Sequence, residues 1–88
     1  MKILHISDTH CQHDKINIPR DIDIIIHSGD FSNKKDSFRN ESEAHSFLDW
    51  FSSLDIRHKI LVAGNHDTSI QARLITPKEI ENRGIIYL

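Results

Sequence analysis

Three short stretches of the chain carry side chains that can bind metal ions. They read Asp8-Thr9-His10, Gly29-Asp30 and Gly64-Asn65-His66-Asp67. In an extended segment, residues two apart project to the same side, so Asp8 and His10 can reach one ion. A carboxylate beside an imidazole suits a divalent cation such as manganese, iron or zinc. Taken alone, this Asp-x-His pair is a weak signal.

The other two stretches add different chemistry. Gly29 lets the backbone turn sharply, and the two oxygens of the Asp30 carboxylate can bridge a pair of cations. Asn65 offers a neutral carbonyl oxygen, which adds no charge to a site rich in carboxylates. His66 can contact a substrate phosphate or protonate a leaving alkoxide, because imidazole titrates near neutral pH. Singly, each stretch is also explained as a turn or a helix cap, and the coincidence of all three favours a functional site.

Each stretch follows a short apolar run that predicts a β-strand. The expected strands cover residues 3–7, 21–28 and 60–63, with a fourth at 85–88. Their nearly continuous apolar character is typical of strands buried on both faces of a parallel sheet. Ligand sites in such sheets form beyond the carboxyl ends of the strands. All three stretches stand at such an end.

Two helices are expected between the strands. The first has one apolar stripe at helical spacing, made of Ala44, Phe47, Leu48, Phe51 and Leu54. Asn40 is expected to be its N-cap, with Glu43 as the reciprocal partner. The second helix is expected to start at Thr76-Pro77 and to stop at Gly84. The order of elements predicts an α/β fold with a largely parallel sheet of about four strands.

The composition of the chain argues against a nucleic-acid-binding, membrane or secreted protein. The chain has 88 residues, enough for one small domain over residues 1–88, and a net charge of −2 that predicts no binding to nucleic acid or to an anionic membrane surface. Its longest apolar run is far short of the ~20 residues that a membrane span needs. A single cysteine, Cys11, and the lack of a visible secretory signal favour a cytoplasmic protein. Seven histidines raise the expectation of metal chemistry.

The three stretches resemble the calcineurin-like metallophosphoesterase superfamily, whose N-terminal blocks are Asp-x-His, Gly-Asp and Gly-Asn-His-(Asp/Glu). Within it, four segments are similar to the metallophosphoesterase-domain-containing (MPPED-like) group. They are Ser7–His10, His27–Asn33, Phe47-x-x-Trp50 and His58–Asp67. Matching features run from Ile3 to Leu88. The resemblance implies that the chain is the N-terminal half of a metallophosphoesterase α/β sandwich.

The resemblance also implies roles for individual residues. It implies Asp8, His10 and Asp30 on a first metal ion, and Asp30 with Asn65 on a second. His66 corresponds to the catalytic histidine of the superfamily. The implied cofactors are two divalent ions (Mn, Fe or Zn), and the implied reaction is hydrolysis of a phosphoester by a metal-bound hydroxide. A phosphodiester is favoured, and the MPPED-like group leans toward a cyclic nucleotide as the small substrate.

The chain departs from the superfamily pattern in two places. Asn33 stands where many members carry an aspartate that supports the catalytic histidine. The C-terminal Gly-His and Gly-His-x-His blocks that complete both metal sites are missing, since residues 68–88 contain no histidine. The second metal is left with only two visible ligands. We therefore expect a truncated domain that is not a competent hydrolase alone.

Two alternatives to an enzyme fragment remain open. One is a non-catalytic metal-binding or interaction module that assembles through an exposed sheet edge. The other is a site completed in trans, by a second copy or by a separate C-terminal half. Three further histidines are given no chemistry: His27 is expected to pack beside the site, His5 to pack within its strand, and His13 to lie in a loop.

Overall fold

The computed structural model describes residues 1–32, 37–64, 67–71 and 74–88, so Asn33, Asn65 and His66 lie outside the described residues. Its strands are β1 (Ile3–Ile6), β2 (Ile24–His27), β3 (His58–Leu61) and β4 (Ile86–Tyr87). They form one parallel sheet in the order β1-β2-β3-β4. The helices are η1 (His13–Lys15), α1 (Ser37–Ser53), α2 (Thr68–Gln71) and α3 (Pro77–Asn82). The predicted parallel α/β sheet is confirmed.

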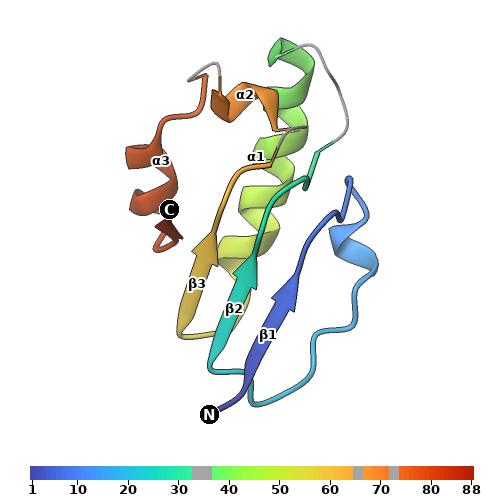
Figure 1. Ribbon diagram of the computed structural model, residues 1–88, viewed down its shortest axis with the longest axis vertical. Coiled ribbons are helices and arrows are strands. Elements are labelled where there is room, and N and C mark those ends of the chain that lie inside the picture. Colours follow the sequence, from blue (N-terminus) through green and yellow to red (C-terminus); the bar gives the residue numbers. More distant parts are fainter. Residues whose placement is uncertain (33–36, 65–66, 72–73) are drawn as a thin grey trace.

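One face of the sheet packs against α1, which lies behind β2 and β3 in Figure 1. Ile25 on β2 and Leu61 on β3 are both fully buried on this face, since Leu61 is in register with His27, two residues along β2 from Ile25. The predicted apolar stripe of α1 is confirmed, since Ala44, Phe47, Leu48 and Phe51 are also fully buried. Leu54 lies just beyond the helix and is half-buried. This contact forms the core of the molecule.

The opposite face of the sheet is open over the described residues. Ile3 on β1 and Ile86 on β4 keep 57% and 47% of their surface exposed. His5 is exposed as well, and its Nε2 lies 2.9 Å from the hydroxyl of Ser28. The prediction of strands buried on both faces is therefore wrong for the described structure, and His5 does not pack in a core. Alternation between one buried and one open face explains the difference.

The ends of the helices explain two further outcomes. Thr76 accepts a hydrogen bond from the amide of Glu79 and forms the expected capping box of α3. Gly84 follows this helix with a φ of +81°, as a C-terminal stop requires. The prediction for Asn40 is wrong: α1 begins at Ser37, so Asn40 lies inside the helix, and it is fully buried. No helix in the described part of the chain is long and apolar enough to cross a membrane.

Candidate functional site

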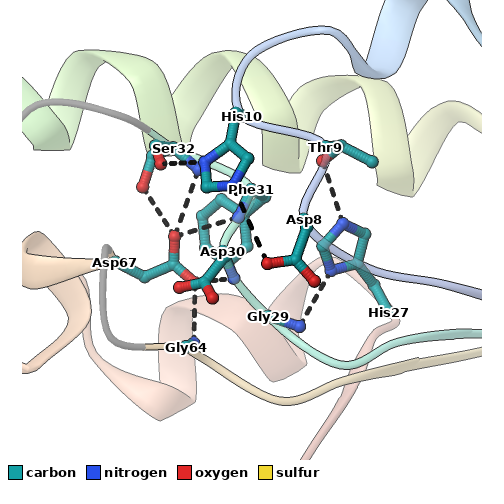
Figure 2. Close-up of polar contacts among 10 residues, drawn as sticks. All are labelled: Asp8, Thr9, His10, His27, Gly29, Asp30, Phe31, Ser32, Gly64 and Asp67. Atoms are coloured by element: carbon teal, nitrogen blue, oxygen red, sulfur yellow. Dashed lines mark hydrogen bonds and ion pairs between the residues drawn. The ribbon is translucent and has the colours of Figure 1, made fainter.

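The predicted ligands that the structure describes gather at the carboxyl edge of the sheet. Asp8 and His10 follow β1, and Asp30 follows β2. Figure 2 shows the two carboxylates and the imidazole ring turned toward one another. The His10 Nε2 lies 3.7 Å from Asp8 Oδ1. Three potential donor groups from two separate loops therefore lie at the same edge of the sheet.

Backbone hydrogen bonds hold these two loops side by side after the strands have ended. The amide of Asp8 donates to the carbonyl of Gly29 at 2.9 Å, and that of His10 to the carbonyl of Asp30 at 3.1 Å. The amide of Cys11 continues the pattern by donating to Phe31 at 2.9 Å. The ladder thus extends the pairing of β1 and β2 into the site. It sets the separation between the ligand-bearing segments.

The site backbone is in an uncommon conformation. Asp8, His10, Cys11 and Asp30 all have positive φ, between 41° and 65°. Non-glycine residues rarely adopt this region, and such residues cluster at functional sites. Asp8 and His10 are therefore brought together by left-handed turns, not by the extended geometry that the sequence suggested. Their proximity was expected, but the conformation that produces it was not.

Two glycines let the loops after β2 and β3 touch. A Cβ on Gly29 would lie 2.6 Å from the amide nitrogen and 2.7 Å from the Cα of Gly64. A Cβ on Gly64 would in turn overlap the backbone and side chain of Asp30. Gly29 also has a φ of +113°. The close approach of the two backbones therefore requires glycine on both sides.

Asp67 ties these same two loops together through its side chain. Its Oδ2 accepts hydrogen bonds from the amides of Asp30 at 2.9 Å and Gly64 at 2.8 Å. Its Oδ1 accepts from the amides of Phe31 and Ser32 at 3.1 and 3.2 Å, and from the Ser32 hydroxyl at 2.6 Å. Figure 2 shows this carboxylate between the two segments. Asp67 is an anchor for the site.

Burial raises the pKa of Asp67 above its ordinary value, and the hydrogen bonds from Ser32 and the backbone amides oppose this effect. The residue is fully buried, so its five accepted bonds replace the water that a carboxylate otherwise needs. Sequence reasoning assigned no role to Asp67. The available signal was an acidic residue that ends the Gly-Asn-His-Asp block directly after a buried strand.

A sequence model of calcineurin-like phosphoesterases matches residues 1–86. The chain belongs to the calcineurin-like phosphoesterase family. It is 40% identical over 62 residues to human metallophosphoesterase domain-containing protein 1, covering 70% of this chain and 18% of the human protein. Two Caenorhabditis elegans UPF0046 proteins are 36% and 38% identical over 67 and 72 residues, which are 76% and 81% of this chain. The matches cover 21% and 24% of those proteins, so the chain spans about a fifth of the length of these relatives.

The donor types at the edge of the sheet fit the divalent metals that calcineurin-like phosphoesterases generally use. Asp8 keeps 63% of its side chain exposed and His10 35%, so both can be reached from solvent. Within residues 1–32, 37–64, 67–71 and 74–88, however, no three His, Cys, Asp or Glu side chains are grouped as a metal site. The described residues of this calcineurin-like domain thus place potential ligands at one edge of the sheet without forming a metal cluster of three such side chains.

His27 forms hydrogen bonds with both loops that carry the predicted ligands. The amide of Gly29 donates to its Nδ1 at 3.1 Å, so the ring proton is on Nε2, which donates to the hydroxyl of Thr9 at 3.0 Å. The ring packs against Phe47, with centroids 4.8 Å apart. This confirms the expected packing role. It also links the loops that carry the predicted ligands, because Thr9 stands between Asp8 and His10.

His13, which was expected to lie in a loop, packs in the core instead. His13 belongs to η1 and is only 6% exposed. Its ring lies 5.4 Å from the ring of Phe47 and 5.2 Å from that of Trp50, measured between centroids. His13 therefore packs η1 onto α1, and the prediction of a loop histidine is wrong.

The state of His27 predicts how stability depends on pH. Burial lowers the pKa of His27 from 6.5 to about 4. Below pH 6.5 the His27 imidazole is protonated in the unfolded chain but stays neutral in the folded protein. The free energy of unfolding therefore falls as the pH falls toward 4. Between pH 7 and pH 4 this difference corresponds to about 3 kcal/mol. Urea unfolding across this range is expected to show the loss.

The variant His27→Gln is the matched control for this prediction. Glutamine keeps a polar side chain but has no group that titrates between pH 4 and 7. We expect the variant to start less stable at pH 7 and to lose less further stability on acidification. An identical slope in both proteins would assign the pH dependence to other groups.

Proposed function

We propose that this chain supplies the N-terminal part of a dinuclear metal site that hydrolyses a phosphodiester. The observation that carries the proposal is the meeting of Asp8, His10 and Asp30 at one edge of the sheet, from loops held together by backbone hydrogen bonds. Membership of the calcineurin-like phosphoesterase family supports the reaction class. We infer that the remaining ligands come from further segments of the domain, since the match to the chain covers only 18% and 21% of two longer relatives.

In this proposal Asp8, His10 and Asp30 would hold one divalent ion, and Asp30 with Asn65 would hold a second. Mn, Fe and Zn all suit these ligands. Bound divalent ions neutralise negative charge on phosphoryl oxygens and lower the pKa of water. His66 contacts the phosphate or carries a proton to the leaving oxygen. The proposed substrate class is a small phosphodiester such as a cyclic nucleotide.

The test is Asp30→Asn in the full protein. Hydrolysis of bis-p-nitrophenyl phosphate is measured against Mn²⁺ concentration. We expect the variant to lose at least ~100-fold in kcat/KM, because the amide removes charge from a carboxylate that would help to hold both ions, and 100-fold corresponds to about 2.7 kcal/mol. The site backbone is expected to persist, since asparagine also tolerates the positive φ at this position.

Asp55→Asn is the matched control, because Asp55 is exposed and lies between α1 and β3, before the amino end of β3 and away from the site. It is expected to retain wild-type activity. Hydrolysis that needs no divalent ion, or an Asp30→Asn variant as active as wild type, would overturn the proposal.

The open sheet face favours a second candidate function. Ile3 and Ile86 expose apolar surface on strands at the two edges of the sheet, where a non-catalytic module can assemble with another chain. This candidate predicts oligomers and no turnover, with or without metal. Size-exclusion chromatography with light scattering, combined with the phosphodiester assay, distinguishes it from the hydrolase.

A further inference from the structure

A continuous chain of buried polar side chains connects α1 with the candidate site. In order, its members are Ser69, Asn40, Ser32 and Asp67, and each is fully buried. Asn40 comes from the helix, Ser32 from the loop after β2, and the other two from the segment after β3. Burying polar groups costs free energy unless they are hydrogen-bonded to one another. Here each member bonds to the next.

The hydrogen bonds of this chain run in a defined direction. The Asn40 amide nitrogen donates to the Ser32 hydroxyl at 2.9 Å, and this hydroxyl donates to Asp67 Oδ1 at 2.6 Å. A hydroxyl has one proton, so donation from Asn40 leaves the Ser32 proton for Asp67. The Asn40 side-chain oxygen accepts from the amide and hydroxyl of Ser69 at 3.0 and 2.6 Å. Both ends of the Asn40 amide are therefore used.

The last hydrogen bond of the series connects Asp67 to the backbone of Asp30, a predicted metal ligand. Asp67 accepts the amide protons of Asp30 and Gly64, so its position sets the backbone of both loops. Asp30 has a φ of 60°, a conformation that persists only where the surroundings enforce it. An asparagine inside a helix is otherwise a poor choice, because its propensity for helix is low. Its polar contacts explain its presence there.

We propose that Asn40 is a positioning residue for the metal centre and that it acts through Ser32 and Asp67. The inference rests on the proposed function, since it assigns Asn40 to the support of that same site. Asn40 touches neither substrate nor metal. Its amide orients the Ser32 hydroxyl, the hydroxyl fixes the Asp67 carboxylate, and the carboxylate holds Asp30 in the conformation that presents its side chain.

The first measurement is the affinity for Mn²⁺ alone, by calorimetry on the full protein. Loss of a residue that orients a ligand typically weakens metal binding 10- to 100-fold. We expect Asn40→Ala to weaken binding about 10-fold. Asn40→Asp keeps the shape and the acceptor for Ser69 but cannot donate to Ser32 when ionised, so it is expected to weaken binding as well. Ser32→Ala/Asn40→Ala is expected to lose no more affinity than Ser32→Ala, because both side chains act through one path.

Leu48→Val is the matched control on the same helix. Leu48 is fully buried in the apolar core and has no polar group, so its replacement lowers stability without touching the polar chain. We expect its Mn²⁺ affinity to stay within about 2-fold of wild type. An equal loss of affinity in Leu48→Val and Asn40→Ala would overturn the positioning role, because it would assign the effect to stability alone.

A second measurement separates this inference from the proposed function. Amide hydrogen exchange without metal reports directly on the amides of Asp30, Phe31 and Ser32, which donate to Asp67. Asn40→Ala is expected to speed exchange at these amides about 10-fold beyond its effect elsewhere, and Leu48→Val is not. Unchanged relative exchange at Asp30 would overturn the positioning role. Selective change in a protein that binds no Mn²⁺ would overturn the proposed function instead.

Discussion

Gly29→Ala is expected to remove most of the free energy of unfolding of the protein at 25 °C. The new Cβ would lie 2.6 Å from the Gly64 nitrogen and 3.1 Å from the Ala63 carbonyl carbon, both backbone atoms that cannot turn aside. The residue would also have to adopt a φ of +113°. Overpacking together with backbone strain costs about 3–4 kcal/mol, most of the stability of a domain this small. Circular dichroism and urea unfolding measure the loss.

Gly84→Ala separates the two causes. Gly84 also has a positive φ, +81°, but a Cβ there meets nothing within 4 Å. Only the conformational cost remains, about 1 kcal/mol. We expect this variant to fold with a slightly lower melting temperature. Equal losses in the two variants would show that contact between the loops after β2 and β3 contributes little.

Asp67→Asn is expected to lower the free energy of unfolding by about 3 kcal/mol. Asparagine has nearly the same shape, but one of its two terminal atoms becomes an NH₂ group that faces donors. Oδ2 accepts from two amides, and Oδ1 from two amides and a hydroxyl, so either orientation leaves at least two buried donors unsatisfied. Each such donor costs about 1–3 kcal/mol. For a domain of this size, the melting temperature falls by roughly 15 °C.

Asp8→Asn is the matched control for this loss, since Asp8 lies at the same edge of the sheet with its side chain 63% exposed. In metal-free protein we expect its unfolding curve to overlay that of the wild type within about 0.5 kcal/mol, as surface substitutions usually do. Stability that survives Asp67→Asn would contradict the anchoring role. Calorimetric melting of metal-free samples decides between these outcomes.

The parallel sheet was predictable because its strands are short, apolar and bounded by polar turns. The stripe of α1 was predictable for the same reason, since Phe47 and Phe51 recur on one side of a helix. The burial of both sheet faces was not a safe inference. Positions 3 and 25 are both isoleucine, yet Ile3 is more than half exposed and Ile25 is fully buried. An apolar residue in a strand therefore does not reveal whether its face of the sheet packs against a helix.

The gathering of Asp8, His10 and Asp30 was predictable from the rule that ligands lie beyond the carboxyl ends of parallel strands. The buried network was not. Asn40 was interpreted as a helix cap because asparagine is common there, and only the three-dimensional contacts reveal that it pairs with Ser32 and Ser69. Partners separated by 8 and 29 residues leave no local pattern. Hydrogen bonds between distant loops depend on tertiary packing, which propensities do not encode.

The strand order β1-β2-β3-β4 has a consequence for synthesis on the ribosome. Each strand pairs with the strand that precedes it in the sequence, so its partner has already been synthesised when it leaves the ribosome. The β1–β2 pair is available once residue 27 has emerged, and the ladder from Asp8 to Gly29 can close shortly afterwards. Sheet growth can therefore proceed vectorially, from the amino end onward. The loops bearing Asp8 and Asp30 would then be aligned before translation reaches α3.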